Sequence, residues 1–373
     1  MSSDYEPHSE AALQHRELRK ERLEAVRREH KRLIGRKVTF LVLIIGLIVF
    51  AVGFIITLGP LDITIPQVYE TLLARFLPDF FTMDEVFEQV VWNIRFPRII
   101  GGIFAGFGLG ICGCVMQAVL KNPLASPFTL GISSGAHFGV AIAAVFGVAV
   151  IGGPYLLIAN AFAFAMLCSL FIVSLSVLKG ATSETLILAG IGINYLFSSL
   201  SQLMAYFASD EQLRLMTVWG MGDLSAFSWS KFGLFFVVFG VCVPILWWKA
   251  QDLNLMTIGD DSAKSLGVEA NHVRIITMMV ASVLVATIVC FTGTIGFVGL
   301  VAPHVARMLI GADHRILIPA SGILGAFLLI GSDAVAMNII SPTIIPTGIM
   351  TALLGVPFFL YLILKGKRKE FWQ

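Results

Sequence analysis

Two stretches of this chain carry glycine spacings that could bind a nucleotide. Residues 108–113 read GLGICG and satisfy G-x-G-x-x-G, the pattern by which a strand-to-helix turn cradles a pyrophosphate. They lie inside a continuous apolar run with no strand pattern before them, so the context that this motif needs is missing. Near Gly259 the chain comes closest to a P-loop, but Ala263 stands where the glycine before Lys264 is required. We therefore expect no nucleotide site here, and no nucleic-acid partner.

Histidines, cysteines and serines are not gathered in any spacing that suits a metal or a nucleophile. His304 has no second histidine or carboxylate at helical ligand spacing, so a zinc site is not expected. The five cysteines all lie in apolar segments, and the one close pair, Cys112 and Cys114, has no neighbouring ligand; we interpret them as packing residues with free thiols. The sequence predicts neither an enzyme nor a bound cofactor.

Long apolar segments position all of these residues. Of the 373 residues, 57% are hydrophobic and 13% are charged, which excludes a soluble globular domain. The apolar runs are continuous rather than alternating, which excludes a porin-like barrel, and about 20 such residues cross the bilayer as a helix. The sequence predicts an all-α polytopic membrane protein with ten spanning helices. The expected spans are 38–58, 98–120, 128–150, 154–178, 185–207, 232–248, 273–292, 295–310, 316–332 and 346–364.

Lysine and arginine are distributed unevenly over the connections between these spans. With the N-terminus inside, 21 of the 26 fall on the inner side, as the positive-inside rule requires. Both termini are therefore predicted to be cytoplasmic: 1–37 is a basic tail, 38–364 the ten-helix domain and 365–373 a short tail. The basic tail either lies on the anionic inner leaflet or is a solvated extension. The five outer cations are Arg75, Arg95, Arg98, Arg214 and Lys231.

Glycines recur at every fourth residue over 102–110 and again over 131–139. In lipid, helices gain nothing by burying apolar surface against each other, so small residues that permit close approach favour their association. We interpret both stripes as packing surfaces.

The longest joint on the predicted cytoplasmic side is residues 249–274. Asp260 and Asp261 favour a helix N-terminus, Gly267 favours a helix stop, and Asn271 is suited to cap the following span. Four side chains make the joint more apolar than a solvated loop needs: Ile258, Ala263, Leu266 and Val268. They either enter a groove of a cytoplasmic partner or pack back onto the membrane domain.

An ion-coupled secondary transporter is the competing class of function. Such carriers usually hold carboxylates near the middle of the bilayer, where an ionisable group is costly. Here Glu184 and Asp333 fall near span ends, and the interior polar residues are neutral. Energy supplied by another protein fits this interior better.

Six segments, in order along nearly the whole chain, resemble one family. They are RFPR (95–98), GCVMQAVLKNPLASPFTLGISSGA (113–136), WGMGDLSAFSW (219–229), IGDDSAKSLGV (258–268), GTIGFVGLVAPHVARMLIGADHR (293–315) and PTGIMTALLGVPFFLYLILKGKR (346–368). On them the chain resembles the FecCD or cobalamin-permease-like family. These are the permease subunits of type II ABC importers for iron-siderophore complexes, haem and cobalamin.

The resemblance implies the type II importer fold in a prokaryotic plasma membrane. A second permease, identical or related, would complete the pathway, two cytoplasmic ATPase subunits would attach below, and an extracytoplasmic binding protein would dock above. ATP would be hydrolysed on the ATPase subunits. The residues that match the ATPase-coupling loop are Gly259, Asp260, Asp261, Ser262, Ala263, Leu266, Gly267 and Val268.

The resemblance also assigns roles at the outer mouth and along the pathway. Arg95 and Arg98 match family arginines that pair with glutamates of the binding protein; anchoring of span two at the interface is the alternative. A third family arginine appears here as Met337, which favours a heterodimer. Span five resembles the pathway-lining helix through Asn194, Ser198 and Gln202. Ferric siderophore is the expected cargo, with haem or cobalamin as alternatives.

Overall fold

The computed structural model describes residues 15, 19, 24, 35, 37–59, 61, 63–75, 77, 85–148, 150–179 and 183–365. The chain divides into two compact units, residues 1–47 and 48–373. The packing described below is that of the second unit. The two predicted tails lie almost entirely outside the described residues, so their roles stay predictions.

Every regular element of the described residues is helical, which confirms the predicted all-α class. Besides the helix over Lys37–Thr57, the elements that carry the argument are α2 (Ile65–Ala74), α3 (Glu85–Phe87), a π-helical turn (Glu88–Arg95), α4 (Phe96–Val119), a 3-10 turn (Pro127–Leu130), α5 (Ile132–Phe146), α6 (Leu156–Lys179), α7 (Ser183–Phe207), α8 (Asp210–Gly220), a 3-10 turn (Leu224–Ala226), α9 (Trp229–Trp248), α10 (Ala250–Ile258), α11 (Asp260–Ser265), α12 (Ala270–Thr292), α13 (Val298–Ile310), α14 (His314–Asn338) and α15 (Thr347–Lys365).

Among the described residues, seven helices are long and apolar enough to cross a membrane, and three shorter apolar helices accompany them. The three short ones are α5, α13 and α15. Together these ten fall one for one on the predicted spans, although the number that cross the bilayer stays a prediction. The second span begins earlier than predicted, at Glu85 rather than at 98. The helix continues through Pro97 because the preceding π-helical turn carries the chain into α4, where proline occupies a tolerated first-turn position.

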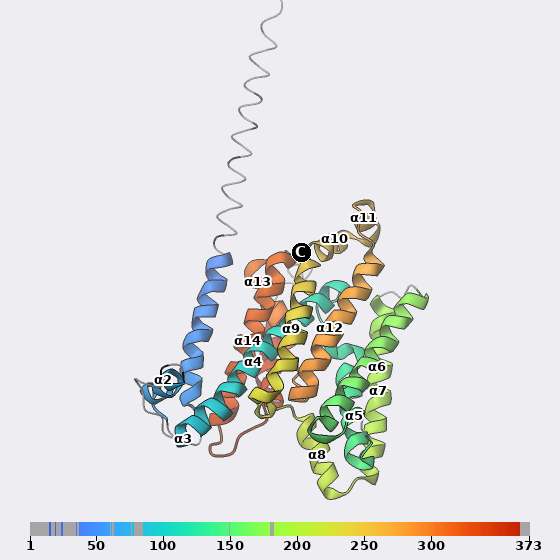
Figure 1. The fold of residues 1–373 in the computed structure, drawn as a ribbon. Helices are drawn as coiled ribbons and strands as arrows, with labels where there is room; N and C mark the ends of the chain where they lie inside the picture. Colours follow the sequence, from blue (N-terminus) through green and yellow to red (C-terminus); the bar gives the residue numbers. More distant parts are fainter. Residues whose placement is uncertain are drawn as a thin grey trace, which may run out of the picture. The chain divides into compact units, whose positions relative to one another are not determined.

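The core of the second unit is built around α4, which packs against α12, α13 and α14 (Figure 1). A Cβ added at Gly106 would collide with the Gly325 carbonyl oxygen of α14, and one at Gly110 with the Ser321 carbonyl oxygen. A Cβ at Gly139 on α5 would likewise collide with Asn160 on α6. Both glycine stripes are therefore the close-packing surfaces that the sequence predicted.

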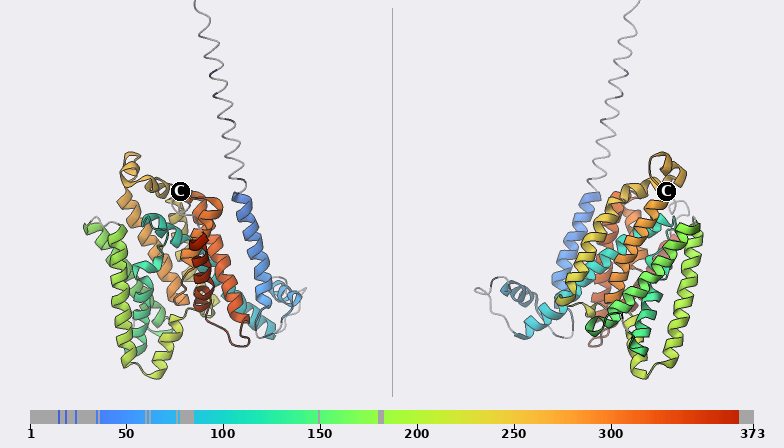
Figure 2. Two further views of the ribbon diagram at one scale, coloured as in Figure 1. Left: turned by 180° about the vertical axis from the view of Figure 1, so that it is seen from behind. Right: turned by 45° about the vertical axis from the view of Figure 1, so that its right-hand side comes forward.

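The two ends of this helical unit carry different short elements. Figure 1 shows α10 and α11 at one end and α8 and α2 at the opposite end, and the two views of Figure 2 agree. We call these the α11 end and the α8 end. The charge distribution predicts that the α11 end is cytoplasmic.

Candidate functional site

Residues 258–268, which we call the α11 segment, are shaped by two glycines in backbone conformations that other residues rarely adopt. Gly259, with a φ of +134°, separates α10 from α11, and Asp260 and Asp261 occupy the first turn of α11. At the other end Gly267 has a φ of +87° and donates to the Lys264 carbonyl oxygen (3.0 Å). Val268 donates to the Ala263 carbonyl oxygen (2.9 Å), which completes a Schellman stop. The start of the helix and its glycine stop are those that the sequence predicted.

Asp260 ties this segment to two membrane helices. Its carboxylate accepts from Lys121 Nζ (2.9 Å), just past the end of α4, and from Arg274 Nη2 (3.0 Å) on α12. Burial raises the pKa of Asp260, but the hydrogen bonds and charges of Lys121 and Arg274 outweigh it and lower the pKa overall. Asp260, Lys121 and Arg274 form what we call the Asp260 cluster. The short helix is thus fastened at its N-terminus by a charged carboxylate.

The four apolar side chains of the segment have different environments. Ala263 is buried and Val268 is half-buried, so these two pack back onto the protein. Ile258 and Leu266 are 67% and 61% exposed. Among the other predicted contact residues, Asp261 and Ser262 are exposed and Gly259 is half-buried. Two large apolar side chains are therefore presented at the α11 end, as contact with a partner requires.

The predicted cap of the next helix is wrong. The helix α12 begins at Ala270, one residue before Asn271, and its N-cap residue is Glu269. Asn271 Oδ1 instead accepts from Arg274 Nη1 (2.7 Å). The amide that seemed free to cap a helix is taken by a buried guanidinium.

The two predicted docking arginines are buried and bonded within this chain. Arg95 Nη1 donates to the Ile56 carbonyl oxygen and Nη2 to the Leu61 carbonyl oxygen, both at 2.7 Å. Arg98 forms a two-pronged pair with Asp333 on α14: Nε donates to Oδ2 (2.9 Å) and Nη2 to Oδ1 (2.8 Å). No second protein is present, so a docking role stays a prediction.

Arg98 is the centre of a larger set of contacts at the α8 end. Its Nη2 also lies 3.1 Å from Asp223 Oδ1, and Thr347 Oγ1 at the start of α15 donates to Asp333 Oδ1 (2.6 Å). We call Arg98, Asp223, Asp333 and Thr347 the Arg98 cluster. It joins α4, α14, α15 and the connection after α8. Asp333, which the sequence placed near a span end, is a structural partner here.

The predicted pathway residues lie along neighbouring pockets beside α7. Asn194 and Ser198 line a pocket of about 400 Å³, and Ser198 and Gln202 line a second of about 300 Å³. A third pocket of about 310 Å³ shares Ser133 and Thr294 with the first. Among the described residues, no Asp, Glu, Lys or Arg lines any of the three. The structure therefore groups the three predicted side chains around neutral, hydroxyl-rich space.

Several further lining residues were missed by sequence reasoning. Ser134 Oγ donates to Asn194 Oδ1 (2.9 Å), and Asn194 Nδ2 donates to the Phe128 carbonyl oxygen (3.2 Å). The other missed polar residues are Ser126, Ser133, His137, Ser201, Thr217 and Thr294. The run of small polar residues in ISSGAH was the available signal, but only the fold shows that this face of α5 meets α7.

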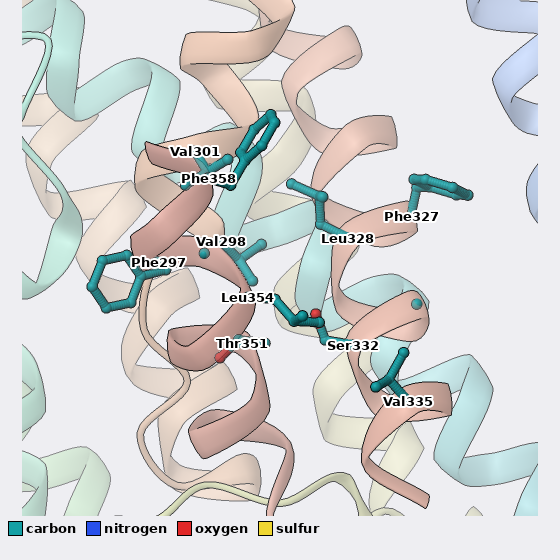
Figure 3. Close-up of a pocket in the computed structure, with 12 residues that line it drawn as sticks. Phe297, Val298, Val301, Phe327, Leu328, Ser332, Val335, Thr351, Leu354 and Phe358 are labelled. Carbon is teal, nitrogen blue, oxygen red and sulfur yellow. The ribbon is translucent and has the colours of Figure 1, made fainter. Parts of the chain in front are cut away.

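An apolar pocket of about 330 Å³ lies between α13, α14 and α15 (Figure 3). Leu328 and Val335 line it from α14 and Leu354 from α15. Phe297 lines both this pocket and the adjoining polar one, and its φ of +66° is strained for a bulky residue. The Val298 amide donates to the Gly296 carbonyl oxygen (2.8 Å), so Phe297 is the centre of a γ-turn. Phe297 therefore lies where the two pockets adjoin.

The chain is similar to known proteins along most of its length. The model of the FecCD transport family matches residues 43–365. A protein described as an ABC transporter permease of Methanocaldococcus jannaschii is 40% identical over 349 residues, which cover 90% of this chain and 97% of that protein. The hemin transport system permease protein of Yersinia pestis is 37% identical over 284 residues, covering 75% and 85% of the two chains.

A solved structure and the cargoes named for other relatives complete the comparison. The structure, described as an inward-facing metal-chelate type ABC transporter, has a TM-score of 0.78 at 32% identity and covers 88% of this chain and 99% of its own. Other similar permeases are named for molybdate, Fe(3+)-citrate, iron(3+)-hydroxamate and cobalamin. The chain belongs to the FecCD transport family, the permease subunits of ABC importers.

Proposed function

We propose that this chain forms the translocation pathway of an ATP-driven importer for an iron chelate, with ferric siderophore as its cargo. The observation that carries the proposal is the α11 segment. Two exposed apolar side chains flank α11, which Asp260 fastens to the membrane helices: Ile258 is the last residue of α10, and Leu266 is the C-cap residue of α11. In the proposed importer this segment seats in a groove of a cytoplasmic ATPase subunit.

The neutral pockets beside α7 support a conduit rather than a high-affinity site. Hydroxyl and amide groups hydrogen-bond weakly to many kinds of ligand, and no fixed charge holds the cargo. In this proposal affinity resides in an extracytoplasmic binding protein, which docks at the α8 end. Relatives named for haem, cobalamin and iron(3+)-hydroxamate are about equally similar to this chain, so haem and cobalamin are the alternative cargoes.

Docking through Arg95 and Arg98 would require both side chains to exchange partners. Arg98 would have to release Asp333, and a buried carboxylate left without its cation is destabilised by several kcal/mol. A glutamate of the binding protein would need to compensate for that loss. We therefore propose that the two arginines shape the docking surface, with direct contact only if their internal pairs open.

The test of the coupling role is a charged substitution at an exposed apolar position. Leu266→Asp removes an apolar side chain whose full burial contributes about 1.5–3 kcal/mol, and puts a charge into the groove. We expect at least about tenfold less ATPase to co-purify with the tagged permease. The matched control is Gln251→Asp, which adds the same charge at an exposed position of α10. Full ATPase recovery with Leu266→Asp would contradict the proposal.

Uptake measurements separate the cargoes and the competing class. Cells lacking this gene are given labelled ferric hydroxamate, haem or cobalamin, and the cargo whose uptake falls is identified. Uptake unchanged for all three would overturn the cargo assignment but leave the fold intact. Stable transport in vesicles without any ATPase subunit would favour the ion-coupled carrier instead.

A further inference from the structure

The middle of α10 is joined to the first turn of α14 by the side chain of Asn254. Its Oδ1 accepts from the His314 backbone N–H (2.9 Å) and from His314 Nδ1 (2.7 Å). Its Nδ2 donates to Asp313 Oδ1 (2.8 Å). A carboxylate can only accept, so the amide nitrogen must face Asp313 and the amide oxygen must face His314. Both ends of one amide are therefore used between the two helices.

On the α14 side of this link, Asp313 is held by further hydrogen bonds from Arg315. Asp313 Oδ1 accepts from the Arg315 backbone N–H (3.1 Å), which caps α14, and Oδ2 pairs with Arg315 Nη2 (2.8 Å). Hydrogen bonds from Arg315, and then from Asn254, lower the pKa of Asp313 despite partial burial. The carboxylate is thus charged throughout the physiological pH range, and His314 is buried. Titration of Asp313 therefore does not break the link at physiological pH.

Asn254 lies on α10, next to the segment that is proposed to meet the ATPase. Only Gly259 separates α10 from α11, the segment proposed to meet the ATPase. On the other side, α14 has 25 residues, about 37 Å of helix, and carries Asp333 of the Arg98 cluster near its far end.

We propose that Asn254 is a positioning residue that makes α10 and α11 move together with α14. Displacement that α11 passes to α10 then reaches the helix that carries Asp333 of the Arg98 cluster, instead of being lost as movement of α10 relative to α14. Among the described residues, the side-chain hydrogen bonds that join α10 to the start of α14 are those of Asn254, because the nearby bond from Trp247 Nε1 to the Arg315 carbonyl oxygen (3.0 Å) begins on α9. The proposal rests on the importer function proposed above.

The test measures cargo uptake and ATP hydrolysis together in vesicles that contain the whole importer. The cargo is labelled ferric hydroxamate, haem or cobalamin, whichever the unaltered importer takes up. With Asn254→Ala we expect the ATPase to stay bound and to hydrolyse ATP, while cargo moved per ATP falls at least tenfold. Gln251→Ala, an exposed position on the same helix, should leave this ratio unchanged. An unchanged ratio with Asn254→Ala would overturn the proposal.

A polarity swap checks that the hydrogen bonds are responsible. Asn254→Asp alone places two carboxylates against each other and should lower the ratio further. Asn254→Asp combined with Asp313→Asn restores a donor and an acceptor across the same gap and should recover at least half of the original ratio. Failure of the pair to recover, in an assembled importer, would contradict the link.

Two outcomes keep the inference separate from folding and from the proposed function. Should Asn254→Ala fail to assemble, Asn254→Gln keeps the amide but lengthens the side chain by one methylene. It should assemble and still lose cargo moved per ATP, and a full ratio there would overturn the proposal. Absence of ATP-driven uptake by the unaltered importer would instead refute the proposed function.

Discussion

Two charged clusters at opposite ends of the helical unit use the same groups in different surroundings. In the Arg98 cluster the Asp333 side chain is 2% exposed, and both of its oxygens accept hydrogen bonds from Arg98. In the Asp260 cluster the carboxylate is 45% exposed and is shared between Lys121, which is also exposed, and the buried Arg274. Coulomb attraction is screened by water at the exposed cluster and much less at the buried one. The comparison indicates a fixed junction at the α8 end and an adjustable one at the α11 end.

The largest expected effect comes from breaking the buried cluster. Asp333→Ala leaves Arg98 in a low-dielectric site without its two-pronged partner, which should lower the free energy of unfolding by about 3–5 kcal/mol. Thermal unfolding of the purified chain in detergent measures the change. The double variant Arg98→Met with Asp333→Leu removes both charges and should lose much less. A loss below about 1 kcal/mol for Asp333→Ala would show that the two clusters do not differ.

The corresponding change at the exposed cluster should be smaller. Asp260→Ala removes one partner from Lys121, which is 41% exposed, and one from Arg274, which keeps its bond to Asn271. Because Arg274 is buried and Lys121 is exposed, we expect a loss of about 1–2 kcal/mol in the same unfolding assay, between the values for an exposed and a buried pair. The effect on coupling should exceed the effect on stability, because α11 loses its tie to α4 and α12. Equal losses for Asp260→Ala and Asp333→Ala would contradict the comparison.

A pH titration should reveal the Asp260 cluster at low pH. The pKa of Asp260 is lowered in the folded chain, from about 3.9 when unfolded, so its charged form stabilises the fold at all pH values above about 4. This contribution is lost as the pH falls through the folded pKa, below about 4. The difference in melting temperature between the unaltered chain and Asp260→Asn should be constant from pH 7 to 5 and should shrink below pH 4. A difference that grows on acidification would be inconsistent with this sign.

Added salt should cause the smallest change in stability, and this change should differ between the two clusters. The Debye length falls from about 10 Å at 0.1 M salt to about 3 Å at 1 M, which weakens exposed pairs more than buried ones. The destabilisation caused by Asp260→Ala should therefore shrink at 1 M sodium chloride, while that caused by Asp333→Ala should stay nearly constant. Equal salt dependence would indicate that both clusters are hydrated.

Local patterns predicted the short elements where neighbours in sequence are also the partners in space. The start of α11 at Asp260 and its stop at Gly267 follow from hydrogen bonds within a few residues. The same reasoning failed at Asn271, because a buried arginine one turn away competes for its amide. It also failed at the start of the second span, where a π-helical turn carries the helix through Pro97.

Functional groups separated widely in sequence were beyond local reasoning. Arg98 and Asp333 are 235 residues apart, and Asn254 and His314 are 60 residues apart. Nothing in the spacing of either residue names its partner. His137 and Thr294 belong to the polar pockets only because α5 and the connection before α13 pack beside α7.

The sequence by itself determined that this chain is a helical membrane protein with a short structured segment between α9 and α12. Apolar length, charge distribution and capping residues suffice for that, because helices satisfy their backbone hydrogen bonds locally. Only the tertiary structure decided which charges are paired, which polar side chains share a pocket and which helix is hydrogen-bonded to α10. Those outcomes depend on contacts between residues far apart in the sequence, such as Arg98 with Asp333 on the closely packed helices α4 and α14.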